Sequence, residues 1–309
     1  MLIFCRRVII NKPEKLKRKG PLILACNHPN SFLDAAILAD LFNEPVYSLT
    51  RGDAFKKPFY AKLLMRLKML PVYRTSEGVE NLNENYQTFT ECKKLFRRDG
   101  IVLIFSEGKC INEWHLRPLK KGTARLAFSS WDENIPLEVL PVGFNYSSFR
   151  RFGKNLFLNF GEIITKSDFD QNASDGIKHQ LFNQKLEQEF NKIVFEIPKN
   201  DVALQKKILE IPPNLFTKIV LAIPAAIGFL VHAPLYIPVE SFTIKRTYSN
   251  DHHDSVLMAL LLFFYPIYLI LITIIVILLT RNLWFLSLVF LLPVTAWAYV
   301  QIKGQQDKS

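Results

Sequence analysis

Two short stretches of the chain carry residue types suited to acid–base chemistry. The first, Asn27-His28-Pro29-Asn30-Ser31-Phe32-Leu33-Asp34, follows a short apolar run and opens a helical pattern. A histidine can remove a proton from an alcohol, and a carboxylate on its other ring nitrogen fixes the tautomer and stabilises the imidazolium. His28 and Asp34 are therefore candidates for a general base and its orienting partner. Taken alone, this spacing is more typical of a capping histidine beside a solvated aspartate.

The second stretch, Phe105-Ser106-Glu107-Gly108-Lys109, also follows an apolar run. Backbone N–H groups around a glycine at such a turn can cradle a phosphate, and Glu107 can hold a polyol hydroxyl. Ser106 is not a nucleophile elbow, because the G-x-S-x-G pattern is absent. Fixed positive charge suited to phosphate comes from four further residues, for which a solvated face is the alternative: Arg74 at the end of LPVYR, Arg117, Lys120 and Lys121.

The elements that position these stretches alternate between strand and helix. The apolar patterns predict strands over 21–26, 46–50, 70–73, 101–105 and 137–145. They also predict a helix that Asn27-His28-Pro29 opens and that runs through Asp40, and helices over 79–98 and 122–130. Such alternation is typical of an α/β fold with a mostly parallel central sheet covered by helices. Ligands bind such sheets at the carboxyl ends of the strands, where both stretches fall.

Composition narrows the function classes. The 309 residues carry a net charge of +11, 49% of them are hydrophobic and 25 are Phe, which excludes a disordered chain. Residues 1–200 hold +9 of this charge and residues 201–309 only +2. A basic first region suits anionic substrates and lipid surfaces, and no nucleic-acid motif accompanies it. Four cysteines without a CxxC pair predict neither a disulfide framework nor a zinc site.

The C-terminal region contains two candidate membrane spans. Val256–Leu279 is uncharged for 24 residues and Leu283–Val300 for 18, with Thr280-Arg281-Asn282 between them. A helix of the first length measures about 36 Å, enough to cross a hydrocarbon core of about 30 Å. The pair predicts a membrane hairpin. The N-terminus has no secretory signal pattern.

A third apolar stretch, Ile219–Ile237, contains Pro224, Gly228 and Pro234 and either spans the membrane or lies in it as a broken re-entrant element. The positive-inside rule favours the second arrangement, because eight of the nine nearby cations then lie on the cytoplasmic side with the catalytic region. We therefore expect a catalytic domain over 1–200, an interfacial region over 201–255 and a transmembrane hairpin over 256–309.

The order of the motifs resembles the glycerolipid acyltransferase family. That family carries NHxxxxD, a strand that ends in Arg, FPEG followed by Thr/Ser and Arg, and a V-P-V strand. This chain has NHPNSFLD, LPVYR, FSEGK and VLPVGF in the same order between Leu22 and Asn145. The longer His-to-Asp spacing and the stretch GFLVHAPLYIP look most similar to the glycerol-3-phosphate/dihydroxyacetone-phosphate acyltransferase branch.

The resemblance implies acyl transfer from a thioester to a hydroxyl, with His28 as general base and Asp34 as its partner. It further implies that Asn27, Arg74, Glu107 and Gly108 bind the acceptor. Neither a metal, a cofactor nor a covalent intermediate is implied, and acyl-CoA or acyl carrier protein is the co-substrate.

Three departures from the family pattern matter. Five residues instead of four separate His28 from Asp34, and the extra one is expected at Pro29-Asn30. Ser106 replaces the usual Pro, and Cys110 stands where the family has Arg. We expect Lys109, Arg117 or Lys120 to supply the missing charge, with Arg117 and Lys120 favoured. The chain also begins almost at the catalytic strand, so the C-terminal hairpin is expected to be the anchor.

The sequence thus favours an integral membrane glycerol-3-phosphate acyltransferase with its catalytic domain on the cytoplasmic face. A lysophosphatidate acyltransferase is the close alternative, differing in the acceptor. An inactive scaffold on the same fold is a further alternative, which the retention of both His28 and Asp34 disfavours.

Overall fold

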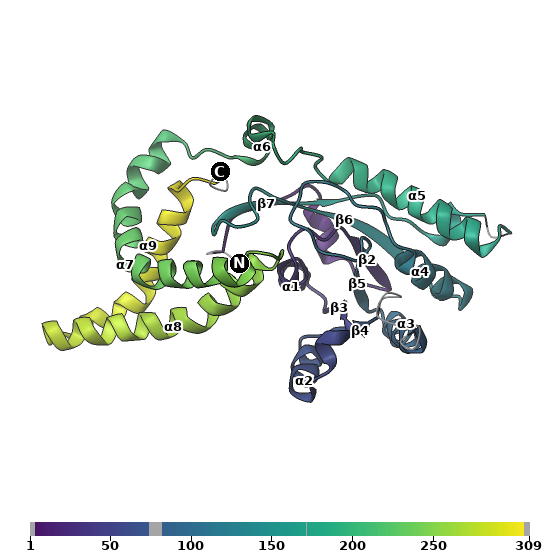
Figure 1. The fold of residues 1–309 in the computed structure, drawn as a ribbon, viewed down its shortest axis with the longest axis horizontal. Helices are drawn as coiled ribbons and strands as arrows, with labels where there is room; N and C mark the ends of the chain where they lie inside the picture. Colours follow the sequence, from purple (N-terminus) through teal and green to yellow (C-terminus); the bar gives the residue numbers. More distant parts are fainter. Residues whose placement is uncertain (1–3, 74–81, 171, 306–309) are drawn as a thin grey trace.

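The computed structural model describes residues 4–73, 82–170 and 172–305. Figure 1 shows two regions, a sheet flanked by helices and a group of three long helices formed by the C-terminal part of the chain. The first region holds the predicted catalytic residues. The second holds the predicted membrane segments.

Within these ranges one sheet has the strand order β1-β7-β6-β2-β5-β3-β4. Neighbouring strands are parallel except β6 and β7, which are antiparallel. This confirms the predicted mostly parallel sheet, although the sequence reading did not anticipate β1 and β7. The strands are β1 (Cys5–Ile10), β2 (Leu22–Cys26), β3 (Val46–Arg51), β4 (Met69–Val72), β5 (Ile101–Phe105), β6 (Glu138–Tyr146) and β7 (Lys154–Phe160).

Helices cover both faces of the sheet. Ile23 and Ala25 of β2 pack on the side of α3, α4 and α5, whereas Leu22 and Leu24 pack on the side of α1. This period-two alternation is what a strand buried on both faces requires. The helices of this region are α1 (Phe32–Leu41), α2 (Pro58–Arg66), α3 (Leu82–Phe96), α4 (Gly122–Asp132), α5 (Asp175–Ile193) and α6 (Val202–Leu209).

The register of the central strands brings the two chemical stretches together. Cys26, the last residue of β2, lies opposite Phe105, the last residue of β5, and opposite Val142 in β6. The strands are parallel, so residues 27–28 and 106–107 leave the same edge of the sheet side by side.

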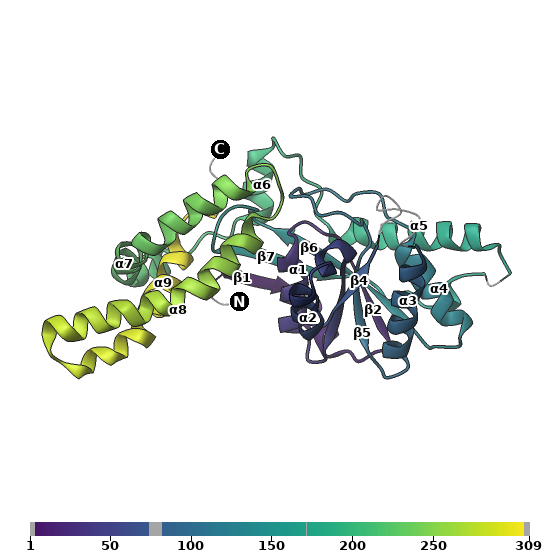
Figure 2. The same ribbon diagram turned by 60° about the horizontal axis from the view of Figure 1, so that its bottom comes forward.

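Three long apolar helices follow: α7 (Leu215–Thr247), α8 (His253–Thr280) and α9 (Leu288–Ile302), the last preceded by the short 3-10 helix η6 (Leu283–Ser287). All three segments are long and apolar enough to cross a membrane. The connection between α8 and α9 lies far from the sheet in Figures 1 and 2. These helices agree with a membrane-associated C-terminal region.

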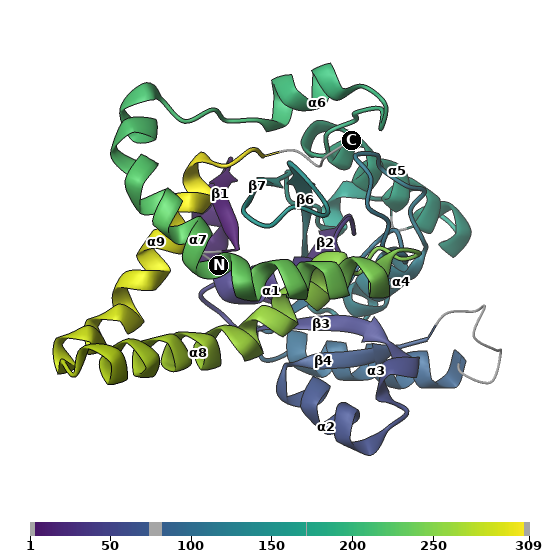
Figure 3. The same ribbon diagram turned by 60° about the vertical axis from the view of Figure 1, so that its left-hand side comes forward.

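Helix α7 differs from the expected broken element, because it is continuous over 33 residues with Pro224, Pro234 and Pro238 inside it. It changes direction along its length (Figures 1 and 3). Helix α7 packs closely against α9. The Gly228 backbone lies directly against the carbonyl of Thr295, where no side chain would fit.

The segments just before and just after α7 contact the sheet region. Before its first residue, the Ile211 carbonyl accepts a hydrogen bond from Arg6 Nη1 at 2.6 Å. After its last residue, the Asp251 carboxylate accepts the Asn112 N–H at 3.2 Å. The chain therefore enters and leaves α7 close to the sheet region.

Candidate active site

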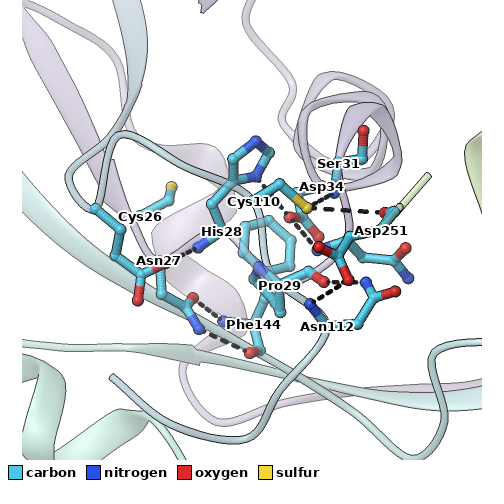
Figure 4. Close-up of polar contacts among 12 residues, drawn as sticks. Cys26, Asn27, His28, Pro29, Ser31, Asp34, Cys110, Asn112, Phe144 and Asp251 are labelled. Atoms are coloured by element: carbon cyan, nitrogen blue, oxygen red, sulfur yellow. Dashed lines mark hydrogen bonds and ion pairs between the residues drawn. The ribbon is translucent and has the colours of Figure 1, made fainter. Parts of the chain in front are cut away.

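The candidate base and its partner are brought together at the end of β2. His28 Nδ1 lies 3.0 Å from Asp34 Oδ2, across the first turn of α1 (Figure 4). The imidazole stacks on Phe105, with ring centroids 3.6 Å apart and an interplanar angle of 15°. The histidine side chain is 17% exposed, whereas Asp34 is fully buried. The predicted pair is therefore formed, with its carboxylate shielded from solvent.

Asp34 has two further donors that fix its orientation. The Asn30 N–H donates to Oδ2 at 2.8 Å, and the Tyr146 hydroxyl donates to Oδ1 at 2.7 Å. Burial, followed by the charge of Asp34, raises the pKa of Tyr146, so this hydroxyl stays a donor. A carboxylate so placed accepts the Nδ1 proton of His28 and leaves Nε2 with its lone pair. Among the described residues Nε2 has no hydrogen-bond partner.

Glu107 connects the two stretches through the backbone. Its Oε2 accepts the His28 N–H at 2.7 Å, and its Oε1 accepts the Arg117 N–H at 2.9 Å. The side chain is 5% exposed. Burial raises its pKa to about 7, and the two N–H donors oppose that shift. Glu107 thus holds the backbone of the base in place, a role that the sequence did not indicate.

The turn after β5 closes against the start of α4. The Lys120 N–H donates to the Ser106 carbonyl at 2.7 Å, and the hydroxyls of Ser106 and Thr123 lie 2.9 Å apart. Gly108 has φ +68°, and a Cβ there would lie 3.1 Å from Lys120 Cγ. The α4 N-terminus, with its partial positive charge, consequently lies at the same sheet edge as the base.

The predicted cationic residues have different environments. Lys109 and Lys120 are exposed, and Arg117 is half-buried with its guanidinium 2.7 Å from Glu113 Oε1. Arg74 lies outside the described residues. The replacement for the family arginine stays a prediction, as does acceptor binding by these residues.

The Asn27 side chain connects β2 to β6 by hydrogen bonds. Its Oδ1 accepts the Phe144 N–H at 2.7 Å, and its Nδ2 donates to the Phe144 carbonyl at 3.1 Å. These bonds tie the end of β2 to β6, which explains a buried asparagine here without a substrate. The predicted contact with the acceptor stays a prediction.

Comparison with known proteins gives a family match for the part of the chain that contains this edge of the sheet. Residues 7–145 match the Acyltransferase family model. The match begins within β1, ends within β6 and includes His28, Asp34, Glu107 and Gly108. It supports an acyltransferase domain in this part of the chain.

A search of curated proteins found no match. Among solved structures, the chain is similar to the 1-acyl-sn-glycerophosphate (LPA) acyltransferase PlsC from Thermotoga maritima. The two are 15% identical with a TM-score of 0.41, and the similarity covers 63% of this chain and 76% of that one.

Cys110, at the position of the family arginine, contacts the connection between α7 and α8. Its Sγ accepts the Ser31 N–H at 2.9 Å and lies 3.9 Å from the Asp251 carbonyl oxygen (Figure 4). Burial, followed by the charge of Asp34, raises the pKa of the thiol, so it stays neutral. Residue 110 therefore connects the loop between His28 and Asp34 to the segment between α7 and α8.

The loop between base and carboxylate has a strained backbone at Ser31. Its φ of 51° with ψ of −137° falls in a region that non-glycine residues avoid, at a cost of about 1–3 kcal/mol. The Ser31 hydroxyl lies 2.6 Å from His252 Nδ1, at the start of the C-terminal hairpin. The extra residue between His28 and Asp34 was predicted at Pro29-Asn30, and the strained residue, Ser31, comes directly after it. The contact with His252 stabilises this backbone conformation.

A fully buried ion pair supports the same loop. Lys154, the first residue of β7, pairs with Asp254 in the first turn of α8, and both side chains are inaccessible. The Asn30 amide donates to Asp254 Oδ2 at 2.6 Å, while the Asn30 N–H donates to Asp34. Asn30 therefore links the Asp34 carboxylate to the C-terminal helices. The sequence reading missed this link.

Proposed function

We propose that this protein is a membrane-bound O-acyltransferase that moves a fatty acyl group from acyl-CoA or acyl carrier protein to glycerol-3-phosphate or dihydroxyacetone phosphate. Such a reaction begins phosphatidic acid and phospholipid synthesis. The match of residues 7–145 to the Acyltransferase model supports the reaction class. The basic charge of residues 1–200 suits an anionic donor and a phosphate-bearing acceptor.

The observation that carries the proposal is the His28–Asp34 pair. Asp34 is buried, accepts from His28, Tyr146 and Asn30, and thereby fixes the imidazole with Nε2 available as a base. A triad-like arrangement of this kind suits removal of a proton from an alcohol.

In the proposed reaction, His28 Nε2 takes the proton of the acceptor hydroxyl as its oxygen attacks the thioester carbonyl. The C–O bond forms, and the tetrahedral intermediate collapses with cleavage of the C–S bond. The imidazolium returns the proton to the leaving thiolate, so the products are an ester and the free thiol. Asp34 stabilises the imidazolium between these two steps.

The acceptor phosphate is proposed to lie beside the turn around Gly108. The α4 N-terminus, Lys120 and Arg117 supply positive charge near this turn. Lys109 is the nearby alternative. Glu107 acts through the backbone of His28 and Arg117.

The acceptor and donor are identified by one experiment on the purified full chain. Labelled acyl-CoA and acyl carrier protein are offered with glycerol-3-phosphate, dihydroxyacetone phosphate and lysophosphatidate in parallel, with His28→Ala as the blank. We expect turnover with glycerol-3-phosphate or dihydroxyacetone phosphate. Turnover with lysophosphatidate alone identifies the alternative acceptor, and no turnover with any acceptor supports an inactive scaffold. His179→Ala, on the far helix α5, is the matched control.

We further propose that the catalytic domain lies on the cytoplasmic face, with α8 and α9 as the membrane hairpin and α7 along the interface. Single cysteines at Asn282, in the hairpin turn, and at Asn250, after α7, test this with a membrane-impermeant thiol reagent. Asn282→Cys is expected to react from the side opposite the catalytic domain, and Asn250→Cys from the same side. Reaction of both from one side would contradict the hairpin.

A further inference from the structure

A cavity of about 1260 Å³ lies between the catalytic domain and the three C-terminal helices. Its walls include Leu33 and Ile37 of α1, Phe229 of α7, Leu261 of α8 and Val300 of α9. In the described chain, neither His28 nor any residue of the turn after β5 lines it. The cavity is therefore separate from the candidate active site.

The size and walls of the cavity suit a lipid. Pockets for drug-sized ligands measure roughly 300–1,000 Å³, so this one exceeds them. Phe229 and Leu262 line the cavity and are also 46% and 76% exposed on the surface of apolar helices. A ligand thus has a route from the lipid phase, and an apolar cavity of this kind takes up apolar chains in preference to water.

One part of the cavity is cationic. Arg150, Arg151 and Lys303 line it, and the Arg151 guanidinium lies against Gly304, next to Lys303. The Lys303 ammonium lies 5.3 Å from the ring centre of Phe152 and 5.8 Å from that of Tyr299. Aromatic faces stabilise a cation without neutralising it.

Lys303 forms no ion pair in the described part of the chain. The charge of Glu240 acts on it from a distance and opposes the lowering of its pKa. Of the two carboxylates that line the cavity, Asp40 is exposed, and Glu240 accepts the Tyr236 hydroxyl at 2.8 Å. Burial lowers the pKa of the Lys303 ammonium to about 7, with the charge of Arg151 as the second cause. An anion at this position would restore its charge.

We propose that this cavity binds one anionic phospholipid of the membrane. Its phosphate lies beside Lys303 and Arg151, and its acyl chains lie along the walls formed by α7, α8 and α9. Lys303 directly follows α9, where a membrane helix meets the headgroups. A lipid bound there fills the space between the hairpin and α1, the helix that carries Asp34.

Native mass spectrometry of the full chain in non-ionic detergent tests the proposal, with phosphatidylglycerol as the probe. Phosphatidylcholine with the same acyl chains and inorganic phosphate are the comparison ligands. We expect one phosphatidylglycerol per chain, and binding of phosphatidylcholine about tenfold weaker. Both lipids carry the phosphate, but the choline ammonium of phosphatidylcholine would be repelled by the cations of the cavity. Equal affinity for the two lipids, or displacement of the lipid by inorganic phosphate at similar concentration, would overturn it.

Variants locate the site. Lys303→Gln is expected to weaken phosphatidylglycerol binding about tenfold, because it removes a charged hydrogen bond to the phosphate. Lys245→Gln is the matched control, because Lys245 is exposed in the last turn of α7 and does not line the cavity. Ala233→Phe narrows the cavity while keeping every cation, so it should also weaken binding, with folding checked by circular dichroism. Unchanged binding in both Lys303→Gln and Ala233→Phe would place the lipid elsewhere.

The outcome is independent of the proposed acyl transfer. Phosphatidylglycerol is neither acceptor nor product of that reaction, and the measurement needs no turnover. His28→Ala should bind phosphatidylglycerol as the wild type does. Loss of binding in His28→Ala would instead place the lipid at the active site.

Discussion

Two buried aspartates lie on either side of the catalytic loop, and their surroundings differ. Asp34 is held by donors without formal charge, namely Tyr146, the Asn30 N–H and the imidazole of His28. Asp254, from the membrane helices, is paired with the ammonium of Lys154. The charge of Asp34 is thus available to the imidazole, whereas that of Asp254 is neutralised. In the proposed mechanism the first carboxylate therefore serves the proton transfer, and the second holds the loop in position.

The largest effect is expected at Asp34. Asp34→Asn keeps the size of the side chain but removes the charge that stabilises the imidazolium, and it disturbs the tautomer of His28. We expect kcat to fall by roughly 10²- to 10⁴-fold, the range of general-base catalysis. Steady-state kinetics across pH, together with the melting temperature, measure this. A variant that keeps more than half of the wild-type kcat would remove the pair from the mechanism.

The corresponding change at Asp254 should act on stability first. Asp254→Asn leaves Lys154 buried without its counterion, which destabilises the fold by about 3–5 kcal/mol. The added change Lys154→Met removes that unpaired charge and should recover most of the melting temperature. Chemical denaturation measures both steps.

Asp254 can then be tested for positioning in the Lys154→Met background. Asp254→Asn keeps an acceptor for the Asn30 amide, whereas Asp254→Leu does not. Leaving a buried donor unpaired costs about 1–3 kcal/mol, so the Leu variant should melt at a lower temperature. Because Asn30 also donates its N–H to Asp34, its displacement should lower kcat of the Leu variant by about tenfold at a temperature where both variants are folded. Equal kcat in the two double variants would show that this contact does not position the loop.

The difference between the two aspartates also explains what the sequence could predict. His28 and Asp34 are six positions apart on a strand end and the helix after it, so local spacing is enough to pair them. Tyr146 lies 112 positions from Asp34, and Asp254 lies 224 positions from Asn30. No local periodicity reports such contacts. The available signals were a lone lysine at the start of an apolar strand and an aspartate just before a long apolar stretch.

Local sequence patterns likewise predicted the central strands of the fold but not the strands that depend on distant contacts. The central strands are continuous apolar runs, which predicts a covered parallel sheet. Strands β1 and β7 form a parallel pair between segments almost 150 residues apart at the sheet margin. Arg6 in β1 and Lys154 in β7 interrupt the apolar pattern because Arg6 donates to the Gln301 carbonyl in α9 and Lys154 pairs with Asp254 in α8. Tertiary contacts, rather than local preference, thus decide these strands.

An intermediate effect is expected at Glu107. Glu107→Gln offers one acceptor for two N–H donors, so either His28 or Arg117 loses its bond. Displacement of the base is expected to lower kcat by about 10- to 100-fold, with little change in KM for the acceptor. A rise in KM at unchanged kcat would instead indicate that Glu107 binds the acceptor directly, as the sequence suggested.

Glu107 also predicts a pH dependence of stability. Its pKa is raised from 4.5 to about 7 in the folded protein, so the fold favours the neutral carboxyl. The wild type should therefore lose stability, relative to Glu107→Gln, as pH rises from 4.5 to 7. Parallel melting curves of the two proteins measure this difference. A constant difference across that range would contradict the raised pKa.

The smallest effects on the kinetics are expected for substitutions of Lys109, Arg117 and Lys120, the cations predicted to replace the family arginine. The stem of Lys120 lies over Gly108, and its N–H is fixed to Ser106, so its ammonium has a short path to the turn. Arg117 is fixed at its N–H by Glu107, and its ion pair with Glu113 is weak enough to exchange for a phosphate. Lys109 is exposed and has no such anchor in the described part of the chain.

We therefore expect Lys120→Ala and Arg117→Ala each to raise KM for glycerol-3-phosphate by about fivefold, equivalent to about 1 kcal/mol of a partly exposed charged contact. Lys109→Ala should change it by less than about twofold. The KM for the acyl donor, measured on the same preparations, is the control for a general loss of positive charge. If only Lys109→Ala raises KM for the acceptor, the missing arginine is replaced by its sequence neighbour. The hydrogen bond from the Lys120 N–H to Ser106 would then help to position the backbone of His28, as Glu107 does, and would not place a cation beside the phosphate.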